Sequence, residues 1–422
     1  MKRLLVVFTD RFPYEGGEPF FETEGSLLKD EFDHILIVAG CRRGETPDRP
    51  LDPGKYTVLG DFTLSKDIAS AAAAALMLPF DGKFLREAWR LIRTGRAGNR
   101  RLYDLAVMAL CANHRAMIAA RWIRRRREYV PETVYAYWLN IPACAALRLK
   151  RFLAVPGLPI IARCHGCDVY PERKQNRYLP LQRQLIDSVD HVAAASADAK
   201  ACLEALHGKT GRISVEYLGA RDMKMCNPSV DREVLRIVSC SRVHPVKRIG
   251  KIVDALSSIR DIKICWTHIG GGPGLDALKA YAGEKLGGNV QAVFTGSLPN
   301  GEVYALYGKE PFHVFVSASE SEGGAPVSVC EAMSFSIPVI LTDAGGHRET
   351  VDHEKNGFLV GKETPEVGIA RCLRMIATMD EGDYTAMRRA ARRKYESRFD
   401  AVKNGRSFIA RYLRTYEEKD HG

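Results

Sequence analysis

Residues 313–346 read HVFVSASESEGGAPVSVCEAMSFSIPVILTDAGG, and this stretch decides the expected fold. An apolar run, His313–Ser317, enters a glycine-rich loop, and a helix is expected to begin near Pro326. A second apolar run, Pro338–Leu341, follows and ends in Ala344-Gly345-Gly346. The succession of strand, loop, helix and strand predicts a βαβ unit in a parallel sheet, with a loop whose backbone can approach a ligand closely.

Similar runs recur along the whole chain, separated by segments of helix length. In the first half they are Leu4–Phe8, His34–Ala39, Thr133–Trp138, Ile160–Cys164, His191–Ala195 and Ile213–Leu218. In the second half they are Leu235–Ser239, Ile262–Ile269, Val290–Phe294, His313–Ser317 and Pro338–Leu341. Most are apolar almost throughout, as expected of parallel strands covered on both faces. The two series predict an α/β protein with two doubly wound, Rossmann-like domains that face one another across a ligand-binding cleft.

The expected domain boundary lies near residue 225, where Asn227-Pro228 marks a break. We expect an N-terminal domain at 1–225, a second domain at 226–400 and a C-terminal helix at 401–422. A chain of 422 residues has room for two such domains. The stretch at about 62–130 interrupts the first series and is expected to be a helical insertion.

The chain carries 62 Lys and Arg against 51 Asp and Glu, a net charge of +11, which suits an anionic partner. The hydrophobic fraction of 46% excludes a mainly disordered chain. Much of the surplus lies between Arg93 and Arg127, where Asp104 is the one acid. This basic insertion has two open interpretations: a packed element with a solvated basic face, or a surface for an anionic membrane.

The segment 84–93 predicts an amphipathic helix with Leu85, Ala88, Trp89 and Ile92 on one face. Nucleic acid is not an expected partner, because the insertion lacks aromatic interleaving and zinc-ligand spacing. The 11 Cys show no disulfide-framework spacing, which favours a reducing compartment. The longest apolar stretch, Ile68–Phe80, is too short to span a bilayer. We therefore expect a cytoplasmic protein.

Two acids frame the glycine loop of the quoted stretch. Glu331 lies on the expected helix, where its carboxylate could accept hydrogen bonds from a ribose diol or cap a loop. Glu322 comes directly before the glycines, and eight residues separate the two acids. The helix start after the loop favours an anion or sugar oxygens.

The quoted stretch resembles the donor-site motif of retaining, GT-B-fold glycosyltransferases of the family-4 type. It is most similar to the bacterial capsular and exopolysaccharide branch, which includes colanic-acid and amylovoran enzymes. In that family a Glu-x7-Glu pair is usual, so this chain has one extra residue. The resemblance implies that Glu331 holds the nucleotide ribose and that Glu322 lies near the donor sugar. The backbone implied to face the donor is that of Gly323, Gly324, Ala325 and Pro326.

A second block, Ser239-Cys-Ser-Arg-Val-His-Pro-Val-Lys-Arg248, follows the first expected strand of the second domain. It resembles the family's S-R-x-x-x-x-K block, which implies that Arg242 and Lys247 hold the donor diphosphate. Two fixed cations can stabilise the charge that develops on a leaving diphosphate without a metal. The alternative is a pair of ordinary surface basic residues. Ile269–Gly274 and Thr295–Asn300 resemble two further turns of the family, one shaping the cleft and one beside the nucleobase.

The first domain also matches the family after two of its strands. Gly16 and Gly17 are implied to close over the diphosphate, with a helix starting near Pro19. His165 is implied to reach the donor sugar, and Asp168 to orient its loop or touch the acceptor. The alternatives are a bare turn and a structural histidine. Three acids in the first block have either an acceptor-sorting role or a place on a solvated helix turn: Glu18, Glu22 and Glu24.

No metal or other cofactor is expected. Cys164 and Cys167 form a CxxC, but two further zinc ligands at matching spacing are missing. Neither a nucleophile elbow nor a P-loop is present. The resemblance implies a glycosyltransferase that moves a sugar from a nucleotide-diphosphate donor, with retention, to a lipid-linked polysaccharide acceptor at the inner membrane face. The alternatives are a nucleotide-sugar epimerase of the same fold and a non-catalytic basic scaffold for membrane or nucleic acid.

Overall fold

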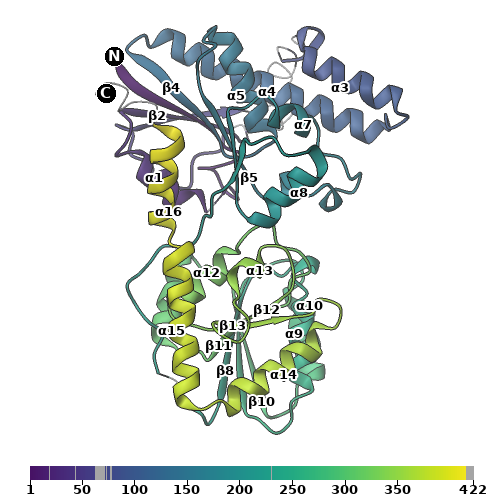
Figure 1. Ribbon diagram of the computed structural model, residues 1–422, viewed down its shortest axis with the longest axis vertical. Coiled ribbons are helices and arrows are strands. Elements are labelled where there is room, and N and C mark those ends of the chain that lie inside the picture. The colour runs from purple at the N-terminus through teal and green to yellow at the C-terminus, as the bar shows by residue number, and fades with distance from the viewer. Residues whose placement is uncertain are drawn as a thin grey trace. The chain divides into compact units, whose positions relative to one another are not determined.

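The computed structural model describes residues 1–18, 20–42, 44–61, 72, 74–76, 78–229 and 231–414. Four sequence expectations fall wholly or partly outside this range: the helix start near Pro19, the first part of the helical insertion at about 62–130, the run Ile68–Phe80 and the end of the C-terminal helix. The chain forms two compact units, one of Met1–Glu216 with Gly405–Gly422 and one of Tyr217–Asn404. Each unit has its own parallel sheet (Figure 1).

The first unit is built on a seven-stranded sheet in the order β3-β2-β1-β4-β5-β6-β7. Its strands are β1 (Lys2–Phe8), β2 (His34–Gly40), β3 (Tyr56–Asp61), β4 (Tyr129–Ala136), β5 (Ile160–Cys164), β6 (His191–Ala194) and β7 (Ile213–Val215). All neighbouring pairs are parallel. The apolar runs of the sequence find six of these strands and miss β3, whose apolar part is short because the strand ends in Gly60 and Asp61.

Helices cover both faces of this sheet, because alternate residues of β1 point to opposite sides. Leu4, Val6 and Phe8 pack in one core. Leu5 and Val7 pack in the other, which also contains residues of the C-terminal segment. The helices are α1 (Phe21–Leu28), α3 (Gly82–Arg93), α4 (Asn99–Arg125), α5 (Ile141–Leu153), α6 (Gly166–Val169), α7 (Gln182–Ile186), α8 (Ala197–His207) and the end of α16 (Ala401–Phe408), which runs into a π-helical turn, Ile409–Leu413.

The helical stretch between β3 and β4 is part of the core as well as of the surface. α4 lies beside α5 on one face of the sheet (Figure 1) and buries a row of small and apolar side chains. α3 begins at the N-cap Asp81, whose carboxylate accepts hydrogen bonds from the backbone N–H groups of Lys83 (3.1 Å) and Phe84 (3.2 Å). α3 buries Leu91 and also Glu87, whose carboxylate accepts a hydrogen bond from the Tyr178 hydroxyl at 2.9 Å.

The apolar face expected for this helix is turned to solvent. Leu85, Trp89 and Ile92 are 47%, 59% and 63% exposed. The packing of Leu91 and the bond from Tyr178 to Glu87 fix the other side of α3 against the unit. The insertion is thus packed on its unit through Leu91 and Glu87 while these three apolar side chains stay exposed, and both interpretations of its basic surface stay open.

The second unit has a six-stranded parallel sheet in the order β10-β9-β8-β11-β12-β13. Its strands are β8 (Leu235–Cys240), β9 (Ile264–Ile269), β10 (Val290–Gly296), β11 (Val314–Ser317), β12 (Val339–Thr342) and β13 (Gly357–Val360). Its helices are α9 (Gly250–Ser257), α10 (Leu275–Lys285), α11 (Asn300–Lys309), α12 (Val327–Ser334), α13 (His347–Thr350), α14 (Pro365–Thr378) and α15 (Glu381–Arg398). The sequence runs miss β13, which has only four residues and begins at a glycine.

The division between the units falls after Glu216, earlier than residue 225. The chain from Ala220 onward is held by the second unit. The Ala220 N–H donates to the Phe399 carbonyl at 3.0 Å, and the Asn227 amide donates to the Tyr307 carbonyl at 2.7 Å. These bonds attach the segment around Asn227-Pro228 to the second unit, although its composition is that of a linker.

Both sheets reverse their strand order next to the first strand. In the first unit this point lies between β1 and β4, and in the second between β8 and β11. Loops that follow two such strands leave the sheet in opposite directions, and ligands of doubly wound folds bind between them. The loops after β8 and β11 are those that carry Lys247 and Glu322.

Candidate active site

The loop after β8 is held rigidly by the glycine-rich turn after β9. The Ser241 N–H donates to the Ile269 carbonyl at 3.0 Å, and the Val243 N–H donates to the Gly271 carbonyl at 2.8 Å. Arg242 lies between these two bonds with its side chain exposed. Its guanidinium makes no ion pair within the described part of the second unit. It is therefore a cation on a fixed backbone that can bind an external anion.

Lys247 and Glu322 meet at the switch point of the second sheet. The Lys247 Nζ lies 2.6 Å from the Glu322 Oε1. The Glu320 N–H also donates to the Val246 carbonyl at 2.8 Å, which ties the two loops together beside the pair. Burial alone would raise the pKa of Glu322, but the charge and hydrogen bond of Lys247 outweigh it, so the pKa is lowered. Glu322 is thus held as a carboxylate.

Two glycines after β12 support the loop that Glu322 begins. A Cβ on Gly346 would lie 2.1 Å from the backbone carbonyl carbon of Gly324. A Cβ on Gly345, whose φ is +50°, would lie 2.1 Å from the Glu322 carbonyl oxygen. No side chain fits at either position, which is why this pair is glycine. The backbone of Gly323, Gly324, Ala325 and Pro326 is half-buried, and it leads directly into α12.

Glu331 lies on α12 and is almost fully buried. Its Oε1 accepts a hydrogen bond from the Asn300 Nδ2 at 2.6 Å. Burial raises its pKa, and the hydrogen bonds from Asn300 and Tyr304 partly oppose that rise. Burial and the charge of Glu331 raise the pKa of the Cys240 thiol, at the end of β8, to about 12, and Lys247 opposes that rise.

The second unit therefore brings Lys247 and Glu322 together, places Glu331 on the helix that follows the Glu322 loop, and leaves Arg242 accessible in the same loop as Lys247. Two cations at a switch point can hold a diphosphate, and a buried carboxylate can accept hydrogen bonds from neighbouring hydroxyls. A ligand phosphate that took the ammonium of Lys247 would release the carboxylate of Glu322 for a hydroxyl-rich group. The chemistry of a nucleoside diphosphate sugar fits these groups.

Two residues of this site were not singled out individually from the sequence. Asn300 begins α11 and orients Glu331. His347 follows the glycine pair and is fully buried; its Nδ1 donates to the Thr342 carbonyl at 2.8 Å. Its Nε2 has no hydrogen-bond partner among the described residues. Asn300 ends the block Thr295–Asn300, whose resemblance implies only a turn beside the nucleobase, and a single histidine after two glycines carries no pattern of its own.

In the equivalent loops of the first unit, the carboxylate of Glu18 accepts hydrogen bonds from the loops themselves. The Glu18 carboxylate accepts hydrogen bonds from the N–H groups of Asp10 (2.6 Å), Arg11 (3.2 Å) and Phe12 (2.7 Å). It also accepts one from the Trp138 Nε1 at 2.7 Å, which joins the loop after β1 to the loop after β4. Glu18 is therefore a structural anchor, and neither an acceptor-sorting group nor part of a solvated turn.

The two neighbouring acids, Glu24 and Glu22, differ in burial. Glu24 is buried and accepts hydrogen bonds from the Tyr135 hydroxyl at 2.5 Å and the Arg163 Nη2 at 2.8 Å. Glu22 alone of the three is exposed, with Arg49 3.9 Å away. In the glycine pair between them and β1, Gly16 is exposed with φ +70°, whereas a Cβ on Gly17 would lie 2.6 Å from the Phe12 nitrogen.

His165 and Asp168 follow β5 and lie close together. The Asp168 carboxylate accepts hydrogen bonds from the N–H groups of His165 and Leu139, both at 2.6 Å. The His165 Nε2 donates to the Tyr137 carbonyl at 3.2 Å. Burial lowers the pKa of His165 to about 3 and raises that of Asp168 to about 7. Asp168 thus orients the loop, and His165 is a neutral imidazole.

Metal ligands and membrane spans were sought over the same described residues. They contain no cluster of three or more His, Cys, Asp or Glu side chains placed to bind a metal ion. Cys164 is buried, Cys167 is exposed, and both are free thiols. None of the described helices combines the length and hydropathy required to cross a bilayer.

Comparison with known sequences supports the resemblance stated from the motifs. Residues 228–394 match the protein family described as "Glycosyl transferases group 1". The chain is also 25% identical over 267 residues to the putative colanic acid biosynthesis glycosyltransferase WcaL of Escherichia coli K12. That alignment covers 61% of this chain and 65% of the relative, so the chain spans a little under two thirds of its length.

Comparison with solved structures covers nearly the whole chain. A lipopolysaccharide outer core galactosyltransferase, WaaB in its apo form, aligns with a TM-score of 0.68 and 17% identity over 97% of this chain and 99% of that one. The Anabaena protein HepE, in complex with UDP-glucose, aligns with a TM-score of 0.66 and 16% identity over 98% and 99%. These alignments confirm the expected α/β fold of the GT-B type.

Proposed function

We propose that this chain, whose residues 228–394 belong to the glycosyl transferases group 1, transfers a sugar from a nucleoside diphosphate sugar to a polysaccharide acceptor. The observation that carries the proposal is the meeting of Lys247 and Glu322 at the switch point of the second sheet, with Glu331 buried on the helix that follows the same loop. The similarity to a colanic acid glycosyltransferase and to a structure with UDP-glucose supports the substrate class.

In the proposed reaction, the bond between the sugar carbon and the diphosphate oxygen breaks and a bond to the acceptor oxygen forms. Negative charge grows on the leaving diphosphate, where Arg242 and Lys247 stabilise it. The proton of the acceptor hydroxyl passes to a leaving phosphate oxygen. Glu331 accepts hydrogen bonds from the ribose, and Glu322 accepts them from the donor sugar once a phosphate has engaged Lys247. No metal is assigned a role, and the resemblance to retaining enzymes supports retention.

We place the acceptor on a lipid at the inner face of the plasma membrane. The exposed apolar side chains of α3, Leu85, Trp89 and Ile92, support contact with a bilayer. Arg93 lies over the Trp89 ring at 4.7 Å, so a cation accompanies the apolar face. The roles expected for His165, Asp168, Gly16 and Gly17 toward donor and acceptor stay predictions.

The test begins with the purified chain and a panel of UDP- and GDP-sugars in a thermal-shift assay, because a ligand of the native state raises the unfolding temperature. With the donor identified, Lys247→Ala is expected to slow sugar transfer about 10²–10³-fold, since it removes a cation from the charge that develops on the leaving group. Glu331→Ala is expected to weaken donor binding at least about tenfold, with folding intact.

The matched control is Lys251→Ala on α9, whose ammonium is paired with Asp254 and Glu366, both at 3.4 Å. This variant should leave transfer unchanged. Near-normal turnover of both Lys247→Ala and Glu331→Ala would contradict the site. Conversion of the donor sugar without any acceptor would favour an epimerase, and a chain that binds no nucleotide at all would favour a basic scaffold.

A further inference from the structure

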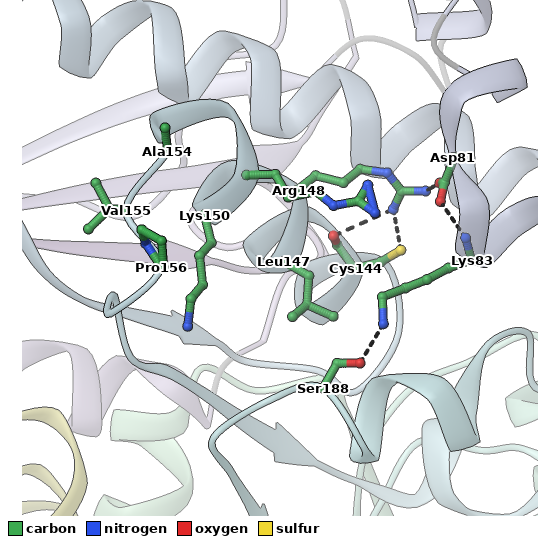
Figure 2. Close-up of a pocket in the computed structure, with 11 residues that line it drawn as sticks. Asp81, Lys83, Cys144, Leu147, Arg148, Lys150, Ala154, Val155, Pro156 and Ser188 are labelled. Carbon is green, nitrogen blue, oxygen red and sulfur yellow. Dashed lines mark hydrogen bonds and ion pairs between the residues drawn. The ribbon is translucent and has the colours of Figure 1, made fainter.

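A cavity lies in the first unit, away from the loops described above. It has a volume of about 410 Å³ and lies between the start of α3, the helix α5 and the loops that precede β5 and β6 (Figure 2). Loops that precede parallel strands lie at the opposite edge of the sheet from loops that follow them. The cavity is therefore separate from His165 and Gly16, which follow β5 and β1.

Its lining is strongly cationic. Four basic side chains, Lys83, Arg148, Lys150 and Arg151, face one acid, Asp81. Arg148 is engaged: its guanidinium donates to the Asp81 carboxylate and to Cys144. Lys150 lies 3.7 Å from Asp190, at the edge of ion-pair distance.

The other two cations have no acid to neutralise them. The Lys83 ammonium donates to the Ser188 hydroxyl, as drawn in Figure 2, and forms no ion pair within the described residues. Arg151 has neither a side-chain hydrogen bond nor an ion pair in the same part of the chain. The charges of Lys83 and Arg151 at this cavity are therefore not neutralised by a carboxylate of the described residues, and an external anion could neutralise them.

The surroundings of Lys83 disfavour the positive charge on its ammonium. Lys83 is half-buried, and burial lowers its pKa; Arg151 and Arg86 lower it further, while Cys144 and Asp81 partly oppose this fall. A bound anion would offset both the desolvation and the repulsion between cations. A phosphate group suits the site, because Lys, Arg and a hydroxyl all donate hydrogen bonds to its oxygens.

The rest of the cavity is apolar, which points to a phosphate attached to a hydrocarbon. Its wall is formed by four apolar side chains, Leu147, Ala154, Val155 and Pro156. Figure 2 shows Lys83 and Lys150 on either side of Leu147. The exposed apolar side chains of α3 begin at Leu85, two residues after Lys83, and therefore lie on the side of the helix away from the cavity. A cationic cavity beside an exposed amphipathic helix has the features of a membrane-lipid site.

We infer that this cavity binds the phosphate of an anionic membrane lipid through Lys83 and Arg151. The inference deepens the proposed function and rests on its membrane placement. It assigns the first unit a discrete lipid site in addition to a diffuse basic surface.

The test uses the full chain and monomeric dihexanoyl phosphatidylglycerol, with binding measured by calorimetry. One lipid is expected to bind per chain. The double variant Lys83→Gln/Arg151→Gln should bind it at least about tenfold more weakly, since each cation near a lipid phosphate contributes about 1 kcal/mol. The matched control, Arg86→Gln/Arg93→Gln, removes the same charge from α3 outside the cavity and should keep binding within about twofold.

Vesicles of phosphatidylcholine with phosphatidylglycerol provide the second measurement. Both double variants should bind them more weakly than the unmodified chain, because both remove surface charge. Loss of monomeric lipid binding in the control as well as in the cavity variant would overturn the discrete site. Equally tight binding of inorganic phosphate would overturn the lipid assignment in favour of a free anion.

Nucleotide-sugar binding is the independent readout. The variant Lys83→Gln/Arg151→Gln should retain the full thermal shift with the donor, which also shows that it is folded. An intact donor shift without lipid binding in the unmodified chain would contradict the lipid site alone. Lipid binding without any donor shift would contradict the proposed transferase and leave the lipid site supported.

Discussion

The two sheets reverse at matching points, yet the loops there are tied in opposite ways. In the first unit, the loops after β1 and β4 are joined by the hydrogen bond from Trp138 to Glu18, 2.7 Å long. In the second, the loops after β8 and β11 are joined by the ion pair of Lys247 and Glu322, 2.6 Å long. Glu18 has four internal donors, whereas Lys247 has an acid that a phosphate can replace.

The difference shows how one architecture separates structure from chemistry. A carboxylate that accepts several backbone N–H groups fixes a loop, and no ligand can displace those donors without unfolding it. A half-buried ion pair is different, because an incoming anion compensates the cation as the carboxylate leaves. We therefore expect substitutions at the first switch point to change stability, and substitutions at the second to change donor binding.

The largest expected effect is on stability. Glu18→Ala removes the acceptor of three backbone N–H groups and of the Trp138 indole. Because buried donors without partners are costly, the free energy of unfolding of the first unit should fall by about 3 kcal/mol or more. Urea titration followed by tryptophan fluorescence measures the loss. Glu22→Ala, which removes an exposed carboxylate from the same region, is the control and should leave the midpoint unchanged.

A fall of less than about 1 kcal/mol for Glu18→Ala would mean that water replaces the carboxylate easily. The contrast between the two switch points would then disappear.

Substitutions in the glycine pair of each unit should have effects of intermediate size. Gly346→Ala places a Cβ 2.1 Å from the Gly324 carbonyl carbon, so the loop that carries Glu322 must move. We expect donor affinity to fall about tenfold or more, measured by the donor-induced thermal shift. Gly16→Ala has open space around its Cβ and only a φ of +70° to oppose it. It should cost about 1 kcal/mol of stability.

If Gly346→Ala binds the donor normally, the position of the loop after β11 is not what sets affinity.

The smallest expected effect concerns the orientation of Glu331. Asn300→Ala removes the amide that donates to its Oε1 at 2.6 Å and should weaken donor binding about three- to tenfold. The same amide lowers the pKa of Glu331, which burial raises, so the variant should raise it further. Only the carboxylate is a full acceptor for ribose hydroxyls. As the pH is lowered, donor affinity should therefore begin to fall at a higher pH in the variant than in the unmodified chain.

Calorimetric titration of the donor at several pH values measures this shift. An unchanged pH midpoint would show that Asn300 only packs against Glu331 and does not tune its charge.

Sequence reasoning succeeded where a pattern repeats and failed where a contact decides. Long apolar runs find most strands, because strands covered on both faces need such runs. β3 and β13 are missed, because the apolar part of β3 is short and β13 is itself very short. The glycine, lysine and glutamate positions of the donor motif are visible in the sequence. The part played by Asn300 is not, because it depends on a hydrogen bond between α11 and α12.

The helix α3 shows the limit most clearly. Its sequence predicts an apolar face, and that face exists, but the structure leaves Leu85, Trp89 and Ile92 exposed and buries Glu87 instead. Periodicity identifies a face of a helix and does not identify what covers it. Likewise, no spacing rule shows that Glu18 accepts four hydrogen bonds while Glu22, four residues on, is exposed to solvent.

By itself the sequence determined two parallel α/β sheets, a glycosyltransferase-type donor motif and a basic amphipathic insertion, because apolar periodicity and local motif spacing are properties of the chain. Only the tertiary structure decided which acids are anchors and which are paired with a displaceable cation, and which cavity keeps cations without acids. Burial and hydrogen-bond partners come from segments distant in sequence, and these determine whether a charge supports the fold or is free to bind a ligand.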